Sequence, residues 1–162
     1  MFKRTWNTQL TANDATQKEE LGVIREEYDA TYGYRKFIYV QAASDTTVAE
    51  GTVVGYSDRK KATVSSDLDD FNPNQVAGVG IGAITASYYG WIQIYGYHGG
   101  VKTNGDDDIV DGMALVLSPA TDGVCDGLEL GTDTAGLTYS KVGVAVADDV
   151  DGDNTVSAFL DC

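Results

Sequence analysis

The stretch VAGVGIGAITASYYGWIQIYGY, residues 76–97, carries the pattern that decides the fold. In its first part valine and isoleucine alternate with glycine, and from Trp91 to Tyr97 isoleucine alternates with aromatic or amide side chains. A period of two sends successive side chains to opposite faces and is typical of β-strands. The stretch therefore predicts strands at residues 76–86 and 91–97.

Similar alternation continues on both sides of this stretch. It predicts further strands at residues 34–41, 48–56, 62–66, 113–117, 128–130, 137–139, 142–147 and 156–160. Turn residues separate them, as in sandwiches and barrels, and the chain has 19 glycines but only 2 prolines. We expect an all-β fold, a small closed β-barrel, because closure removes exposed strand edges. A two-sheet sandwich is the alternative.

Residues 1–31 differ from the single β domain expected over residues 32–162. Thr16-Gln17-Lys18-Glu19 has the spacing of a helical capping box, and Leu21 and Ile24 follow at helical spacing. Gly22 interrupts that pattern, and Val23 favours extended backbone. We expect an extended N-terminal arm with one or two helical turns.

Several apolar residues of this arm have no core of their own. Phe2, Trp6 and Leu10 recur every four residues, before the apolar group formed by Leu21, Val23 and Ile24. We predict that these six side chains contact a partner protein.

Charge divides the chain into the same two parts. The net charge is −14; residues 1–61 hold nine basic and nine acidic residues, whereas residues 62–162 hold two and sixteen. Such an acidic surface repels nucleic acid and anionic lipid. The chain shows no secretory signal and no apolar run long enough to span a membrane. We therefore expect neither nucleic acid nor membrane as a partner.

None of the motifs in the chain predicts catalysis or a cofactor. Gly78–Gly82 has the glycine spacing of a nucleotide loop, but it lies inside a strand and precedes no helix. The acidic turns at 104–108 and 149–154 lack the glycine and glutamate of a calcium loop, so solvated turns are favoured over weak calcium binding. His98 is the only histidine. We expect no enzyme, metal site or cofactor.

Two further features leave alternatives open. Tyr88, Tyr89, Trp91, Tyr95 and Tyr97 lie within ten residues, which suits an oligomer interface, a glycan-binding platform or cross-strand packing. The two cysteines, at positions 125 and 162, could form a disulfide, although thiols stay reduced in a cytosolic protein.

The order of segments resembles that of a known family. ELGVIREEYDATYGYRKFIYVQA is followed by AEGTVVGYS, VAGVGIGAITASYYGWIQIYGYH, a DGxALVLS segment and KVGVAVA. From about Leu21 onward the chain is similar to the small capsid decoration, or cement, proteins of tailed bacteriophages. Its most specific segments are the Gly-Tyr-Arg-Lys-Phe and Tyr-Gly-Trp-Ile-Gln-Ile strands.

This resemblance implies a structural virion protein, made in the host cytoplasm and placed on the outer surface of the assembled capsid. Such proteins associate as dimers or trimers and bridge adjacent copies of the major capsid protein, often through N-terminal arms. The prediction is therefore a homo-oligomer that stabilises the capsid. The alternative is a glycan-binding module or adhesin that uses the Tyr88–Tyr97 aromatics.

Overall fold

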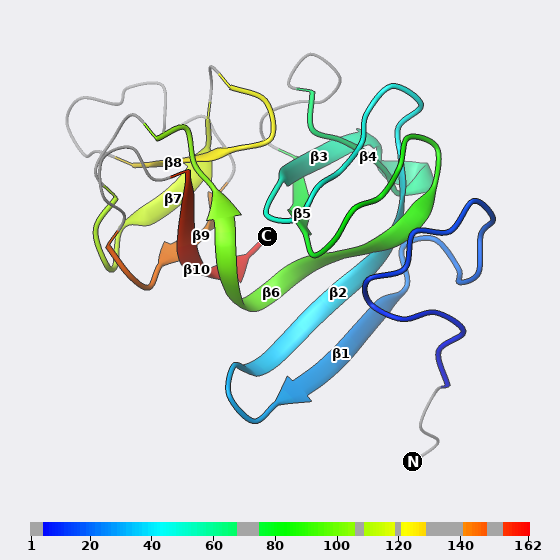
Figure 1. Cartoon of the computed structure of the whole chain (residues 1–162), viewed down its shortest axis with the longest axis horizontal. Helices are drawn as coiled ribbons and strands as arrows, with labels where there is room; N and C mark the ends of the chain where they lie inside the picture. Colours follow the sequence, from blue (N-terminus) through cyan, green and yellow to red (C-terminus); the bar gives the residue numbers. More distant parts are fainter. Residues whose placement is uncertain (1–4, 68–74, 106–108, 119–120, 129–140, 149–153) are drawn as a thin grey trace.

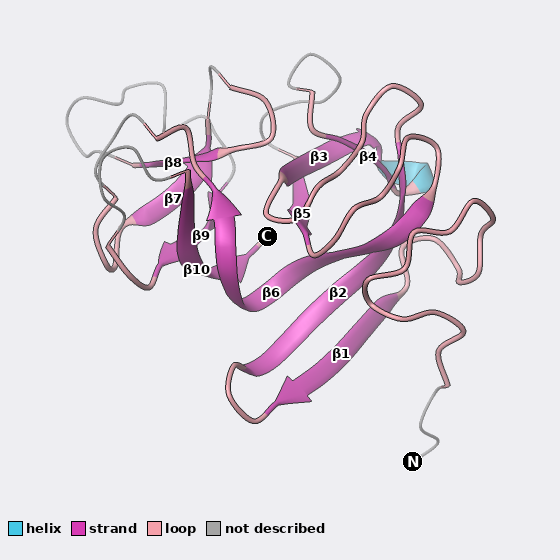
Figure 2. Ribbon diagram, in the orientation of Figure 1, coloured by secondary structure: helices cyan, strands magenta, loops and turns pink. Residues whose placement is uncertain are grey.

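The computed structural model describes residues 5–67, 75–105, 109–118, 121–128, 141–148 and 154–162. Within these ranges the chain forms β-strands and one short 3-10 helix, η1 (Arg59–Lys61) (Figure 2). The strands are β1 (Ile24–Asp29), β2 (Gly33–Ala42), β3 (Val53–Asp58), β4 (Thr63–Ser65), β5 (Val76–Gly80), β6 (Tyr89–Lys102), β7 (Ala114–Leu117), β8 (Cys125–Gly127), β9 (Lys141–Ala145) and β10 (Thr155–Asp161). The all-β prediction is confirmed, and no helix in the described ranges could cross a membrane.

All of these strands belong to one sheet, and part of it closes on itself. The order is β1-β2-β4-β3-β5-β6-β10-β9-β7-β8, and an additional pairing of β2 with β6 completes a ring of β2, β4, β3, β5 and β6. β1 is attached outside this ring, and β10, β9, β7 and β8 continue from β6 (Figure 1). The predicted closure is therefore present in half of the strands, and the sheet as a whole is not a barrel.

The long strand β6 connects the ring with the rest of the sheet. It pairs with β2 and β5 in its first half and with β10 in its second half. Gly96 has φ +92°, and a Cβ there would lie 2.4 Å from the backbone oxygen of Tyr34. Glycine is required because a side chain would be strained and would separate β6 from β2. β6 can therefore pair with β2 and β5 in the ring and with β10 in the rest of the sheet.

Buried side chains form three groups. The ring encloses a core that includes Val40, Val64 and Ile92, and a second core is formed by residues of β7, β8, β9 and β10 together with residues of β3, β5 and β6. The third group, which we call the aromatic cluster, consists of Phe37, Tyr39 and Trp91 on the other face of β2 and β6. Its cover comes from the N-terminal segment.

The predicted arm is in part a strand of the sheet. Residues 24–29 form β1, which pairs antiparallel with β2 from Ile24↔Ile38 to Asp29↔Gly33. The expected helical turns are not found in residues 5–31. The local helical signals give way because pairing with β2 satisfies the backbone and places alternate side chains against the sheet. Residues 5–21 run as an irregular segment across the aromatic cluster (Figure 1).

Some predicted features fall wholly or partly outside the described residues. They are Phe2, the strand expected at 137–139, most of the strand expected at 128–130, and the two acidic turns. The short strand β8 was not predicted, and of the strand expected at 76–86 only Val76–Gly80 is a strand.

Candidate functional site

The N-terminal segment is packed on the aromatic cluster. The Trp6 ring meets the Trp91 ring edge-on, with centroids 5.2 Å apart. Trp91 is only 1% exposed, and its Nε1 donates a hydrogen bond to Thr8 Oγ1 at 2.8 Å. A buried indole N–H needs such a partner. Thr8 and Trp6 therefore complete the environment of a core tryptophan.

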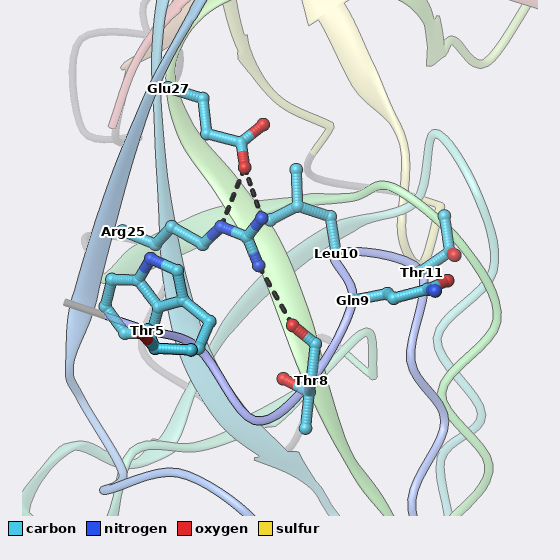
Figure 3. A pocket seen from close by; sticks show the side chains of 8 residues that line it. Thr5, Thr8, Gln9, Leu10, Thr11, Arg25 and Glu27 are labelled. Carbon is cyan, nitrogen blue, oxygen red and sulfur yellow. Dashed lines mark hydrogen bonds and ion pairs between the residues drawn. The ribbon is translucent and has the colours of Figure 1, made fainter. Parts of the chain in front are cut away.

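Arg25 on β1 fastens this segment to the sheet. Its guanidinium carbon lies 5.7 Å from the ring centroid of Trp6 and 5.9 Å from that of Trp91. The same group donates to the Glu27 carboxylate and, through Nη1, to the backbone oxygen of Thr8 at 3.0 Å (Figure 3). A planar cation can stack on aromatic rings and donate at its edges simultaneously. Arg25 thus joins the segment, β1 and the aromatic cluster.

Backbone contacts hold the segment further along. Asp14 and Tyr89 exchange two backbone hydrogen bonds, at 3.0 and 2.9 Å, like a short additional strand. Asn13 uses its amide as donor and acceptor toward Thr85, at 3.0 and 2.9 Å. The segment is therefore anchored by directional bonds at both Thr8 and Asp14.

A groove of about 600 Å³ lies between the segment and β1 (Figure 3). Its lining combines the aromatic side chain of Trp6, the Arg25–Glu27 ion pair and the polar residues Gln9 and Thr11. Gln9 and Thr11 are exposed, and Ile24, which is 49% exposed, lies on the other face of β1 from Arg25 and Glu27. This is a surface of mixed polarity, such as protein interfaces have.

The predicted arm contacts have partners within the chain itself. Trp6, Leu10, Leu21 and Val23 are half-buried against the aromatic cluster, whereas Ile24 remains exposed. Their assignment to a capsid contact stays a prediction. The sequence patterns do not predict the roles of Arg25, Thr8 and Glu27. Arg25 and Glu27 are two residues apart, which is same-face spacing on a strand, but that signal requires β1 to be predicted first.

The tyrosine and tryptophan residues of the predicted interface do not share one surface. Trp91 is a core residue, Tyr89 stacks on Tyr39 within the aromatic cluster, and Tyr88 packs against the ring core. Tyr95 lies elsewhere, edge-on to Phe159 at 5.1 Å. Strand alternation and the irregular register between β2 and β6 direct them to different places. They form no common platform for a glycan, and the interface prediction is not tested for Tyr88, Tyr89 and Tyr95.

An exposed aromatic surface does occur near the β1–β2 turn. Tyr28 is 77% exposed and lies opposite Tyr34, which meets Tyr95 edge-on at 6.5 Å. Lys36 Nζ lies 5.7 Å from the ring centroid of Tyr34 and pairs with Glu26 at 3.4 Å. A hydrogen bond from Tyr34 to Glu26 raises the pKa of the tyrosine and lowers that of the carboxyl group. This surface is mostly aromatic, and the opposite charges of Lys36 and Glu26 leave it close to neutral.

Both ring nitrogens of His98 contact the backbone of the chain. Its Nε2 lies 3.2 Å from the Gly80 oxygen, and its Nδ1 accepts from Gly100 N at 3.2 Å. Only the neutral ring with its proton on Nε2 satisfies both contacts. Burial lowers the pKa of His98 below its ordinary value. Over the described part of the chain, no three His, Cys, Asp or Glu residues gather as metal ligands, and Cys125 and Cys162 do not form a disulfide with each other.

The fold and the packed N-terminal segment define a class: an all-β domain with a partly ring-closed sheet. A search of solved structures finds a similar fold in the N base of the head fiber gp8.5 of bacteriophage phi29. The match has a TM-score of 0.51 and 16% sequence identity, and it covers 76% of this chain and 93% of the other. At this identity the likeness shows the fold alone. No family model matches the sequence, and no curated protein matches it.

Proposed function

We propose that this chain is a structural protein of a bacteriophage virion that binds the outer surface of the assembled head. The observation that carries the proposal is the fold likeness to the phi29 head fiber N base, which spans 93% of that chain. The sequence resemblance to capsid decoration proteins leads independently to the same class of protein. The finer role that we propose is bridging of neighbouring major capsid protein subunits by a homo-oligomer.

The distribution of charge supports one orientation on the head. Residues 1–61 are neutral, whereas residues 62–162 carry the whole net charge of −14. Like charges on the outer surface keep decorated particles apart in solution, and a neutral face carries no such repulsion toward a shell. The N-terminal segment and β1 then face the capsid.

We propose that the N-terminal segment binds while it remains packed on its own domain. Release would break the Trp91–Thr8 and Asp14–Tyr89 hydrogen bonds and would expose the aromatic cluster. Each such bond stabilises by about 0.5–1.5 kcal/mol net, and exposed aromatic area adds to the cost. The contact would therefore use side chains that stay exposed, namely Gln9 and Thr11 on the segment and Ile24 on the opposite face of β1 from Arg25.

Stabilisation of the head would follow from mass action. A protein that binds the assembled shell but not its separated subunits shifts the equilibrium toward the shell. Repetition of one modest contact around a symmetric oligomer gives high total avidity. No catalytic group is required for this role.

The test is co-sedimentation of the purified chain with heads that lack it, followed by thermal disruption of the particles. Wild-type chain is expected to sediment with the heads and to raise their disruption temperature. Ile24→Asp should weaken binding at least tenfold. Val146→Asp is the matched control, because Val146 is an exposed apolar residue (40%) on the acidic part of the chain.

Two results would count against the proposal. Failure of the wild-type chain to bind heads would reject the virion role. Full binding by Ile24→Asp with loss in Val146→Asp would retain the role but reject the proposed orientation.

A further inference from the structure

A second cavity lies on the face of the sheet near the β1–β2 turn. It has a volume of about 420 Å³ and lies among Tyr32, Arg35, Glu50, Gln93, Tyr97 and His98, together with neighbouring residues. These residues come from the β1–β2 turn, β2, β6 and the segment before β3, so no sequence motif describes the site. The volume falls in the range of small-molecule sites, about 300–1,000 Å³.

One wall of the cavity is aromatic and ordered. The rings of Tyr32 and Tyr97 are stacked, with centroids 4.9 Å apart and planes 1° from parallel. The Arg35 guanidinium lies 5.8 Å from the Tyr32 ring centroid, and the Tyr97 hydroxyl contacts Ser157 Oγ at 3.3 Å. Aromatic rings held in this way are already placed for a ligand, which lowers the entropy cost of binding.

The cavity contains both hydrogen-bond donors and hydrogen-bond acceptors. Arg35 supplies only donors, and Glu50 supplies only acceptors. Gln93 is buried, and its Nε2 lies 2.9–3.1 Å from the backbone oxygens of Tyr95, Gly96 and Tyr97. The amide hydrogens of Gln93 are therefore used within the chain. Its Oε1 is the side-chain atom that would accept a hydrogen bond from a ligand.

This combination selects for a neutral, hydroxylated ligand. Glu50 would repel an anion such as phosphate, and Arg35, which also pairs with Asp29 at 3.7 Å, would repel a cation. A hydroxyl group can accept from Arg35 and donate to Glu50 or Gln93. A sugar ring also has an apolar C–H face that can pack on a tyrosine ring. We propose that this cavity binds a neutral saccharide through one pyranose ring.

The site differs from a platform on Trp91, which is buried. It is also independent of the proposed capsid contact, because it does not include the N-terminal segment. A virion protein with such a site would hold a cell-surface glycan through residues other than those that contact the head.

The experiment is an NMR titration of the full ¹⁵N-labelled chain with four probes at tens of millimolar. They are methyl α-D-glucopyranoside, methyl α-D-mannopyranoside, methyl β-D-galactopyranoside and N-acetylglucosamine. At least one is expected to shift the amide signals of Gly99 and Gly100 and the side-chain amide of Gln93. Inorganic phosphate and putrescine are expected to leave these signals unchanged.

Glu50→Gln should weaken the binding at least tenfold, because a charge-assisted hydrogen bond is lost. Glu20→Gln is the control, since Glu20 is an exposed carboxylate away from the cavity. The proposal is overturned if none of the four saccharides shifts these signals. It is also overturned if phosphate or putrescine shifts them instead, or if Glu50→Gln binds as well as Glu20→Gln.

Discussion

Gly80→Ala, compared with Gly82→Ala, tests how the glycines of the 76–82 segment act. Gly80 ends β5, and an added Cβ would lie 2.2 Å from the backbone oxygen of Ala49 and 2.9 Å from Val48 Cγ1. At Gly82 the nearest atoms would be those of Thr11, at 3.8 Å. Neither glycine has a positive φ, so the two substitutions differ mainly in the space available.

The cost at Gly80 follows from what must move. Its backbone accepts a hydrogen bond from Gly51 N at 2.8 Å and donates one to Thr52 O at 2.9 Å. Separating the strands weakens both bonds, each worth about 0.5–1.5 kcal/mol, and overpacking adds about 1–3 kcal/mol. The free energy of unfolding should therefore fall by about 2–6 kcal/mol, or roughly 10 °C in Tm for a chain of this size.

Thermal unfolding followed by circular dichroism measures this difference. Gly82→Ala should stay within about 1 kcal/mol of wild type, because its Cβ meets only ordinary contacts and the substitution also restricts the unfolded chain. Equal Tm values for Gly80→Ala and wild type, or equal losses in the two variants, would refute the close-packing argument.

Three further predictions concern His98, Arg25 and Tyr34. Because burial lowers the pKa of His98 in the folded state, the unfolded state binds more protons below its ordinary pKa of 6.5. Stability is therefore full above that pH and falls below it by at most about 1.4 kcal/mol per pH unit, and denaturant titrations of His98→Gln should lack this component. Arg25→Met should loosen the N-terminal segment and speed proteolysis within residues 5–21, whereas unchanged cleavage would reject its fastening role. Glu26→Gln should lower the pKa of Tyr34 toward its ordinary value in an ultraviolet titration, and no change would show that their hydrogen bond is absent in solution.

The strands with strong alternation could be predicted from the sequence. The prediction at 34–41 corresponds to β2, and that at 156–160 corresponds to β10. β1 was missed because its sequence IREEYD is mostly polar, with exposed and half-buried residues alternating along it. A strand covered on one face only by a thin segment needs few apolar residues, so its composition resembles that of a surface helix.

The candidate sites were harder to predict for a related reason. The sequence predicts Trp6 as an anchor without a core of its own, but for its partner, Trp91, it leaves an interface, a glycan platform and cross-strand packing open. A run of alternating residues cannot by itself say which of its two faces is buried, because both faces of β6 carry large side chains. Only the path of the N-terminal segment across one face settles the question.

What the sequence alone determined was the all-β class, the position of most strands and the separation of a neutral N-terminal part from an acidic remainder. These depend on local side-chain alternation, turn residues and charge. Tertiary structure alone decided that the sheet closes through β2 and β6, that Arg25 joins the N-terminal segment to Trp91, and that Arg35, Glu50 and Gln93 meet in one cavity. Each of these depends on contacts between residues far apart in the chain, and local patterns do not encode which distant surfaces pack together.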